Sequence, residues 1–259
     1  MMIRALQVLV FVFLLASWEI AGRASTDVAF NVGYPSRIGG ELWKLVWEDN
    51  MLFHFYITGA EALCGLILGT LVGSVFGLLL WYSKAVEKVL RPYTIAFGSM
   101  PVLALAPLMI IWFGIGFGMK VALAAFSTVF IGFNQAHRGA MNIESKYVDM
   151  LLGMGATRHQ VFVHVIVPGS LDAVFSALRL SVGFALLGAF IGEFIAADQG
   201  LGHLILKASS LYNTPRALAA GLGIVLLAFL FDRAARYVED RKYLLVQLFS
   251  VPRIIWRGF

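Results

Sequence analysis

Long apolar runs separated by short polar and basic stretches dominate the hydrophobic pattern of this chain. An α-helix rises about 1.5 Å per residue, so about 20 residues cross the roughly 30 Å hydrocarbon core of a bilayer. Six apolar runs approach this length, at residues 5–21, 55–81, 93–113, 119–135, 178–197 and 216–231. The pattern predicts an all-α integral membrane protein with six transmembrane helices embedded in a lipid bilayer.

The composition agrees with a membrane protein and excludes a water-soluble domain. Of the 259 residues, 60% are hydrophobic and 14% are charged, and the mean hydropathy is +0.83. The net charge of +5 comes from basic residues beside the apolar runs, so we assign them to the lipid surface and expect no nucleic-acid partner. The single cysteine, Cys64, excludes an intrachain disulfide and a cysteine-based metal site, and we predict no metal.

The distribution of lysine and arginine predicts the orientation of the spans. Once the six spans are drawn, fourteen of the twenty basic residues fall on one side of the membrane. Loops rich in Lys and Arg face the cytoplasm, so both termini are predicted to be cytoplasmic.

The first apolar run has an alternative interpretation as a cleaved signal sequence. Arg4 precedes the run, and the small residues at 21–24 resemble a cleavage site. Retention and cleavage of residues 1–24 both stay open at this point, and N-terminal sequencing of the mature protein distinguishes them.

A stripe of glycines marks the second run. Gly65, Gly69, Gly73 and Gly77 recur every four residues, which places them on one face of a helix. A face without side chains lets another helix backbone approach closely. We favour packing within this chain, with packing across a subunit interface as the alternative.

Two prolines and two acids interrupt the predicted spans. Pro101 and Pro107 lack backbone donors, which predicts a kink or break in the third span. Such breaks often border a transport pathway. Glu61 and Glu193 lie within spans, where ionisable residues are rare and often functional. Each acid is either part of a pathway or gate, or reaches the outer surface.

The segment 137–179 is too long for a structureless connection. Apolar and charged residues alternate over 145–154 with the spacing of a short amphipathic helix, and Gly155 offers the left-handed conformation that ends one. Thr157 and Gln160 form a capping-box pattern, so a second helix begins there.

This second helix is expected to end before Pro168, since the residue preceding a proline disfavours the helical conformation. A rigid helix, turn and helix on the cytoplasmic face suits docking into the groove of another protein. The alternative is an interfacial helix lying on the bilayer.

The same segment resembles the EAA motif of ABC importer permeases, Glu-Ala-Ala-x3-Gly-x9-Ile-x-Leu-Pro. Asp149 stands in the place of the motif's Glu, Gly155 follows six residues later, and 165–168 end in the motif's proline. The spacing matches at every step, whereas Met150 and Leu151 replace the two alanines. Valines replace the motif's Ile and Leu.

Further segments resemble the nitrate, sulfonate, taurine and bicarbonate branch of these permeases. They are residues 101–108 followed by 111–116, and residues 192–194 followed by 200–205. The resemblance covers residues 58–241 and implies the type I ABC importer permease fold. It divides the chain into an N-terminal helix with an extracytoplasmic segment (1–54), a permease core (55–241) and a cytoplasmic tail (242–259).

The resemblance also implies a function and a set of partners. The chain is expected to form the pathway of an ATP-driven importer in the plasma (inner) membrane, for a small solute such as a sulfonate, nitrate, bicarbonate or a thiamine-precursor-like compound. Its expected partners are two ABC ATPase subunits, an extracytoplasmic solute-binding protein and a second permease copy, with a homodimer favoured over a heterodimer.

Within the docking segment, the resemblance implies that Asp149, Gly155 and Ala156 form the tip that contacts the ATPase and that Pro168 fixes the end of the second helix. ATP and Mg²⁺ would bind the partner subunits, with no cofactor in this chain.

Enzymatic chemistry is not predicted for this chain. It lacks the Gly-x4-Gly-Lys-Ser/Thr phosphate loop and shows no Ser/His/Asp or paired-carboxylate arrangement, so no catalytic residue is assigned. The alternative function is a gradient-driven secondary transporter or channel with Glu61 or Glu193 as the coupling carboxylate, which predicts transport by the purified chain alone.

Overall fold

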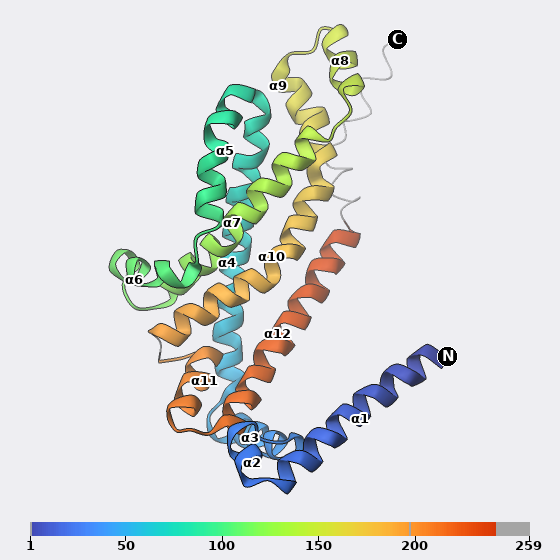
Figure 1. Ribbon diagram of the computed structural model, residues 1–259. Helices are drawn as coiled ribbons and strands as arrows, with labels where there is room; N and C mark the ends of the chain where they lie inside the picture. The colour runs from blue at the N-terminus through green and yellow to red at the C-terminus, as the bar shows by residue number, and fades with distance from the viewer. Residues whose placement is uncertain (1, 197, 242–259) are drawn as a thin grey trace. The chain divides into compact units, whose positions relative to one another are not determined.

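The computed structural model describes residues 2–196 and 198–241, and all regular structure in these ranges is helical (Figure 1). The predicted cytoplasmic tail 242–259 lies outside the described residues. The helices are α1 (Met2–Ala24), α2 (Thr26–Asn31), α3 (Pro35–Glu48), α4 (Met51–Leu79), η1 (Leu80–Tyr82), α5 (Lys84–Gly98), α6 (Val102–Phe113), α7 (Phe117–Met141), α8 (Ser145–Gly153), α9 (Arg158–Val161), η2 (Phe162–Ile166), α10 (Val167–Ile195), α11 (Leu201–Ser210) and α12 (Thr214–Asp240).

Each of the six predicted spans corresponds to a helical segment that is long and apolar enough to cross a membrane. Five are single segments: Leu6–Ala24, Met51–Tyr82, Phe117–Met141, Arg158–Ile195 and Thr214–Asp240. The sixth consists of α5 and α6, which are bent by 94° relative to each other. The prediction of six spans is therefore confirmed when this bent pair counts as one broken span.

The break in the third span lies at Pro101. Pro101 has extended backbone at the N-cap of α6, with φ −63° and ψ 121°. A proline disfavours helical conformation in the residue before it, which here is Met100, so α5 ends before this point. Pro107 lies inside α6, and Pro92 inside α5, without ending either helix.

The described residues divide into two compact units. Within the described ranges, the first contains residues 2–59, 193–196 and 198–227, and the second contains residues 60–192 and 228–241. In the first unit, Glu19 joins α1 to α3, because its Oε1 atom accepts from Ser36 Oγ at 2.7 Å, and Trp18 Nε1 donates to Gly33 O, just before α3, at 3.0 Å. The apolar side chains of α1 are largely exposed, as expected for a helix whose surroundings are lipid.

The core of the second unit is the contact between α4 and α7. A Cβ atom built at any of the four glycines of the predicted stripe would collide with α7. The facing residues of α7 are Ala124 and Ala125, Thr128, Val129 and Phe133. The structure therefore places the glycine stripe of α4 against a helix of the same chain, where the missing side chains allow the two backbones to approach.

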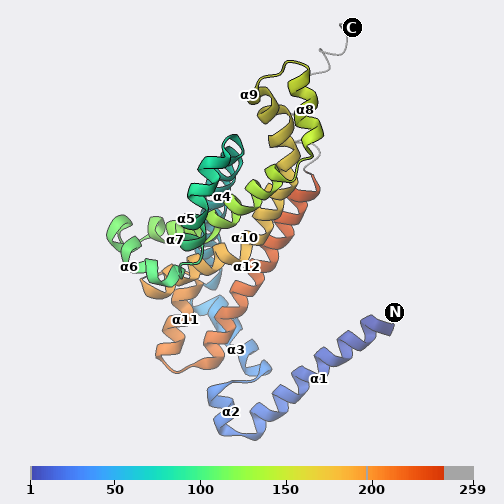
Figure 2. The same ribbon diagram turned by 45° about the horizontal axis from the view of Figure 1, so that its top comes forward.

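The predicted helix, turn and helix after α7 are present as α8 and α9 (Figures 1 and 2). The capping box is confirmed, because Thr157 Oγ1 accepts from Gln160 N at 3.3 Å and Thr157 N donates to Gln160 Oε1 at 2.7 Å. The expectation that the second helix ends before Pro168 is wrong. The chain continues through a π-helical turn at η2 into α10, and Val167 N donates to Phe162 O. This wider turn accommodates a proline that has no donor of its own.

Candidate functional site

The turn between α8 and α9 is a Schellman motif, which is the site's central local structure. Gly155 has φ +86°, a left-handed conformation that glycine adopts without steric cost. Gly155 N donates to Leu152 O, and Ala156 N donates to Leu151 O, both at 3.0 Å. These two bonds satisfy the last carbonyls of α8 and fix the direction in which the chain leaves it.

Apolar packing holds this turn on the rest of the second unit. Val161 and Ile166 form a buried cluster with Ala140 at the end of α7, and Leu151 and Ala156 pack against the cluster. Phe162 adds ring contacts to η1, which directly follows α4. Its centroid lies 5.9 Å from that of Trp81 and 4.7 Å from that of Tyr82. The α8–α9 segment is therefore a packed extension of the helices and not a free loop.

The outer face of the same segment is apolar and exposed. Met154 is 80% exposed and Met150 56% exposed, and Asp149 and Gly155 are also exposed. Unpartnered large apolar side chains around a rigid turn are typical of a surface that docks another protein. Lys146 forms an ion pair with Glu144 at the start of α8, and this hydrogen bond raises the pKa of Lys146.

The predicted tip residues therefore fall into two groups. Asp149 and Gly155 lie on the exposed side, whereas Ala156 packs inward and Pro168 lies in the first turn of α10. Met154 was missed by sequence reasoning, although it is the most exposed apolar residue of the segment. The position of Met154, directly before the glycine that forms the turn, is the sequence feature that could have identified it.

Glu61 forms an ion pair with Lys120 that joins α4 to α7. Lys120 Nζ lies 2.6 Å from Glu61 Oε1, and the two side chains are 6% and 1% exposed. Gly192 of α10 provides room for the lysine, since a Cβ there would lie 2.9 Å from Lys120 Cγ. Pairing makes these two buried charges tolerable inside a membrane protein. Sequence reasoning missed Lys120, although a lysine inside an apolar run is itself a sign of a buried partner.

Glu193 binds the start of α11 within the first unit. Its Oε1 atom accepts from Thr58 Oγ1 at 2.6 Å, and its Oε2 atom accepts from Gly202 N at 2.7 Å. Leu201 N donates to Thr58 Oγ1 at 2.8 Å, which completes the capping of the helix. A carboxylate at a helix N-terminus satisfies free N–H groups and interacts favourably with the helix dipole.

Two neighbours of Glu193 complete this arrangement. Gly200 has φ +111°, and a Cβ there would collide with the Glu193 carboxyl group. Gly200 N donates to His54 Nδ1 at 2.8 Å, so His54 carries its ring proton on Nε2. Sequence reasoning identified Glu193 but missed Thr58 and His54, because these partners lie far away along the chain.

The gating role predicted for Glu61, Glu193, Pro101 and Pro107 stays a prediction. The structure gives both acids specific partners and places the prolines in and before α6. Among the described residues, no group of three or more His, Cys, Asp and Glu side chains is arranged to hold a metal ion.

Comparison with known proteins identifies the family. Residues 65–242 match the family described as the binding-protein-dependent transport system inner membrane component. The chain is 29% identical to the formylaminopyrimidine transport permease protein ThiX of Halalkalibacterium halodurans. The alignment of 233 residues covers 90% of this chain and 92% of that protein. It is 30% identical to the taurine transport system permease protein TauC of Escherichia coli. The alignment of 191 residues covers 73% of this chain and 68% of that protein.

A solved structure agrees on the fold. A chain of the MetNI methionine ABC transporter in an inward-facing conformation matches with a TM-score of 0.65 and 18% identity, over 79% of this chain and 99% of that chain. The expected type I importer permease fold and the expected branch are thereby confirmed. In this family the ATPase is a separate subunit, and the permease is not itself catalytic. The chain belongs to the binding-protein-dependent transport system inner membrane component family and is the multi-pass permease subunit of an ATP-driven ABC importer.

Proposed function

We propose that the α8–α9 segment couples this permease to its ATPase through Asp149, Met154 and Gly155. The observation that carries the proposal is the exposed apolar face around a Schellman turn that is itself packed on the second unit. Exposed methionines supply adaptable contact area, and the carboxylate of Asp149 supplies a charge at the rim.

The packing explains how motion at this tip would reach the membrane helices. The buried cluster joins the segment to the end of α7, and α9 continues through η2 into α10 without a break. A packed element transmits a displacement, whereas a flexible loop absorbs it. Closure of the ATPase subunits would therefore move α7 and α10, and hydrolysis of ATP would reset them.

The assembly we propose contains two copies of this chain as a homodimer, two ATPase subunits and an extracytoplasmic binding protein. ATP and Mg²⁺ are held by the ATPase subunits, and this chain holds no cofactor. Both termini lie in the cytoplasm, because the side with most Lys and Arg also carries α8 and α9.

The test of coupling compares two exposed positions. Met154→Glu places a charge on the apolar tip without touching the buried cluster, and His164→Glu adds the same charge at an exposed position of η2. Met154→Glu is expected to reduce co-purification of the ATPase, while His164→Glu leaves it unchanged. Equal ATPase recovery with both variants would contradict the proposal.

The proposed substrate is a small solute of the kind handled by the relatives. These are named for formylaminopyrimidine and for taurine, a sulfonate, and the branch resemblance adds nitrate and bicarbonate. Identity near 30% to both relatives does not separate these classes. The binding protein recovered with the complex should be stabilised against heat by one class, and ATP-dependent uptake of that compound by proteoliposomes identifies the substrate. Uptake by the purified chain without ATP would instead support a gradient-driven transporter.

A further inference from the structure

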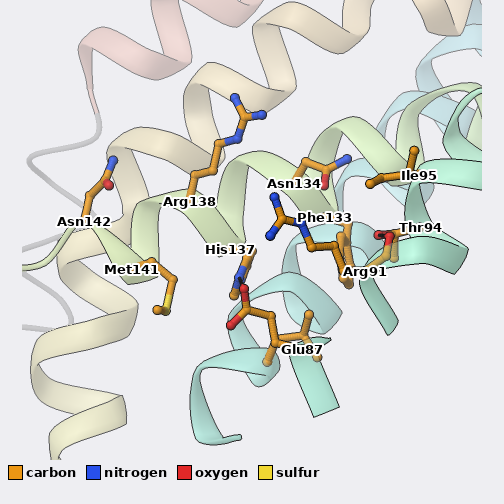
Figure 3. Close-up of a pocket in the computed structure, with 11 residues that line it drawn as sticks. Glu87, Arg91, Thr94, Ile95, Phe133, Asn134, His137, Arg138, Met141 and Asn142 are labelled. Carbon is orange, nitrogen blue, oxygen red and sulfur yellow. Dashed lines mark hydrogen bonds and ion pairs between the residues drawn. The ribbon is translucent and has the colours of Figure 1, made fainter. Parts of the chain in front are cut away.

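A polar pocket lies within the second unit, between α5 and the last turns of α7 (Figure 3). It is a cavity of about 390 Å³. Its polar lining residues are Glu87, Arg91, Thr94, Asn134, His137, Arg138 and Asn142. Apolar side chains, among them Leu80, Ile95 and Phe133, line the remainder.

The two arginines of this pocket have no carboxylate partner. Among the described residues, no Asp or Glu oxygen lies within ion-pair distance of Arg91 or Arg138. The acid that lines the pocket, Glu87, has its Oε1 atom 3.3 Å from His137 Nε2. Two guanidinium groups therefore remain available to a ligand, and the lining carries a net positive charge.

The pocket offers N–H donors to an oxyanion from both α5 and α7. Figure 3 shows Arg91 reaching from α5 toward His137 of α7, while the guanidinium group of Arg138 extends away from Arg91 at the rim. Asn134 Nδ2 uses one N–H group on Phe130 O at 2.8 Å and keeps the other. Guanidinium groups bind phosphate-like oxyanions through paired N–H groups, and a neighbouring amide adds a further donor.

We propose that this pocket binds a phosphate-type oxyanion, which is either the headgroup of an anionic phospholipid or a free anion. The apolar part of the lining suits the carbon atoms next to a lipid phosphate. The pocket lies at the end of α7 that leads into α8, which is the cytoplasmic side in the proposed orientation. The cytoplasmic leaflet is the anionic one in many membranes, and basic pockets between helices on that side bind lipid headgroups.

An occupant would join α5 to α7 next to the coupling segment. The last lining residues, Met141 and Asn142, directly precede α8. A bound oxyanion would thus stabilise the base on which the proposed coupling turn rests. The inference rests on the proposed function only for the assignment of the pocket to the cytoplasmic side of the membrane. Binding of an oxyanion itself needs no ATPase.

The test uses the intact transporter reconstituted in nanodiscs. Arg91→Gln and Arg138→Gln, alone and together, are compared with Lys88→Gln, which removes an exposed positive charge from α5 outside the pocket. Native mass spectrometry measures retained phosphatidylglycerol, and thermal stability with inorganic phosphate in neutral phosphatidylcholine measures binding of a free anion. Loss of each arginine is expected to reduce retention or the apparent phosphate affinity about five-fold.

The outcomes separate the two sources. Retained phosphatidylglycerol that falls in the arginine variants and not in Lys88→Gln identifies a lipid headgroup. Stabilisation by phosphate that depends on the same arginines, without selective lipid retention, identifies a free anion. The proposal would be overturned if the three arginine variants retained as much lipid as Lys88→Gln and responded equally to phosphate. If the double variant does not fold, Arg138→Gln at the exposed rim decides alone. Failure of the proposed ATPase coupling would leave these readouts unaffected.

Discussion

The carboxylate of Glu193 accepts a 2.7 Å hydrogen bond from the backbone N–H of Gly202, at the start of α11. The acid thereby replaces the side-chain cap that Gly200, the N-cap residue, cannot supply. This relationship gives each of the two glycine-containing segments, residues 192–194 and 200–202, a structural role. The first supplies the acid, and the second supplies the N–H group and the space that the acid occupies.

Replacing Glu193 is expected to destabilise the first unit. Glu193→Ala leaves Gly202 N without its buried acceptor, which costs about 1–3 kcal/mol, whereas Thr58 Oγ1 can still donate to His54 O at 3.1 Å. Glu193→Gln keeps one acceptor oxygen and should lose less. Thermal unfolding in detergent measures the difference, with the exposed Glu48→Gln as the control. Wild-type stability of Glu193→Ala would show that the cap contributes nothing.

Gly200 is expected to tolerate no side chain. Gly200→Ala places a Cβ against the Glu193 carboxyl group and holds an L-residue at φ +111°. We therefore expect a loss of thermal stability, together with lower yield from the membrane. Gly183→Ala is the matched control, because a Cβ at Gly183 in α10 meets no atom within 4 Å. The prediction is wrong if both variants unfold at the same temperature.

The Glu61–Lys120 ion pair should behave as a coupled unit. Glu61→Gln or Lys120→Met alone leaves a buried charge without its partner, at a cost of about 3–5 kcal/mol. The double substitution removes both charges and should recover much of the lost stability. Thermal unfolding of the four proteins forms a double-mutant cycle. Additive losses would show that the two charges do not interact, and loss of transport with full stability would instead support the gating role of Glu61.

Gly155 and Gly153 form a matched pair for testing the Schellman turn. A Cβ would meet no atom within 4 Å at either position, but only Gly155 has a positive φ. Gly155→Val should therefore strain the turn by about 1–2 kcal/mol and displace the tip. ATPase recovery and ATP-dependent transport are expected to fall in Gly155→Val, with membrane insertion intact. Gly153→Val serves as the control, and equal activity of the two variants would count against a role for the turn geometry.

Features that depend on neighbouring residues could be predicted from the sequence. Apolar runs indicated the spans, and Thr157 with Gln160 indicated the start of α9, because hydropathy and capping are local properties. Gly155 indicated the turn for the same reason. The glycine stripe indicated close packing of α4, although only the structure shows that α7 is the partner.

Features that depend on distant residues could not be predicted in the same way. Glu61 and Lys120 are 59 residues apart, and Thr58 and Glu193 are 135 residues apart. Sequence spacing carries no information on such pairs until the helices are packed. The passage of the chain through Pro168 was also unpredictable from local rules, which favour a helix end at that point.

The π-helical turn at η2 has a consequence for the orientation of α10. Relative to an uninterrupted α-helix, such a turn accommodates one additional residue, and each residue of an α-helix corresponds to a rotation of about 100°. The turn therefore sets which side of α10 faces the interior of the second unit, where Ser170, Ala177, Ser181 and Ala185 are buried. Regular α-helical winding of the same residues would turn that buried side by about 100°, away from the interior. The inward face of α10 therefore depends on the π-helical turn at η2 as well as on the side chains of α10 itself.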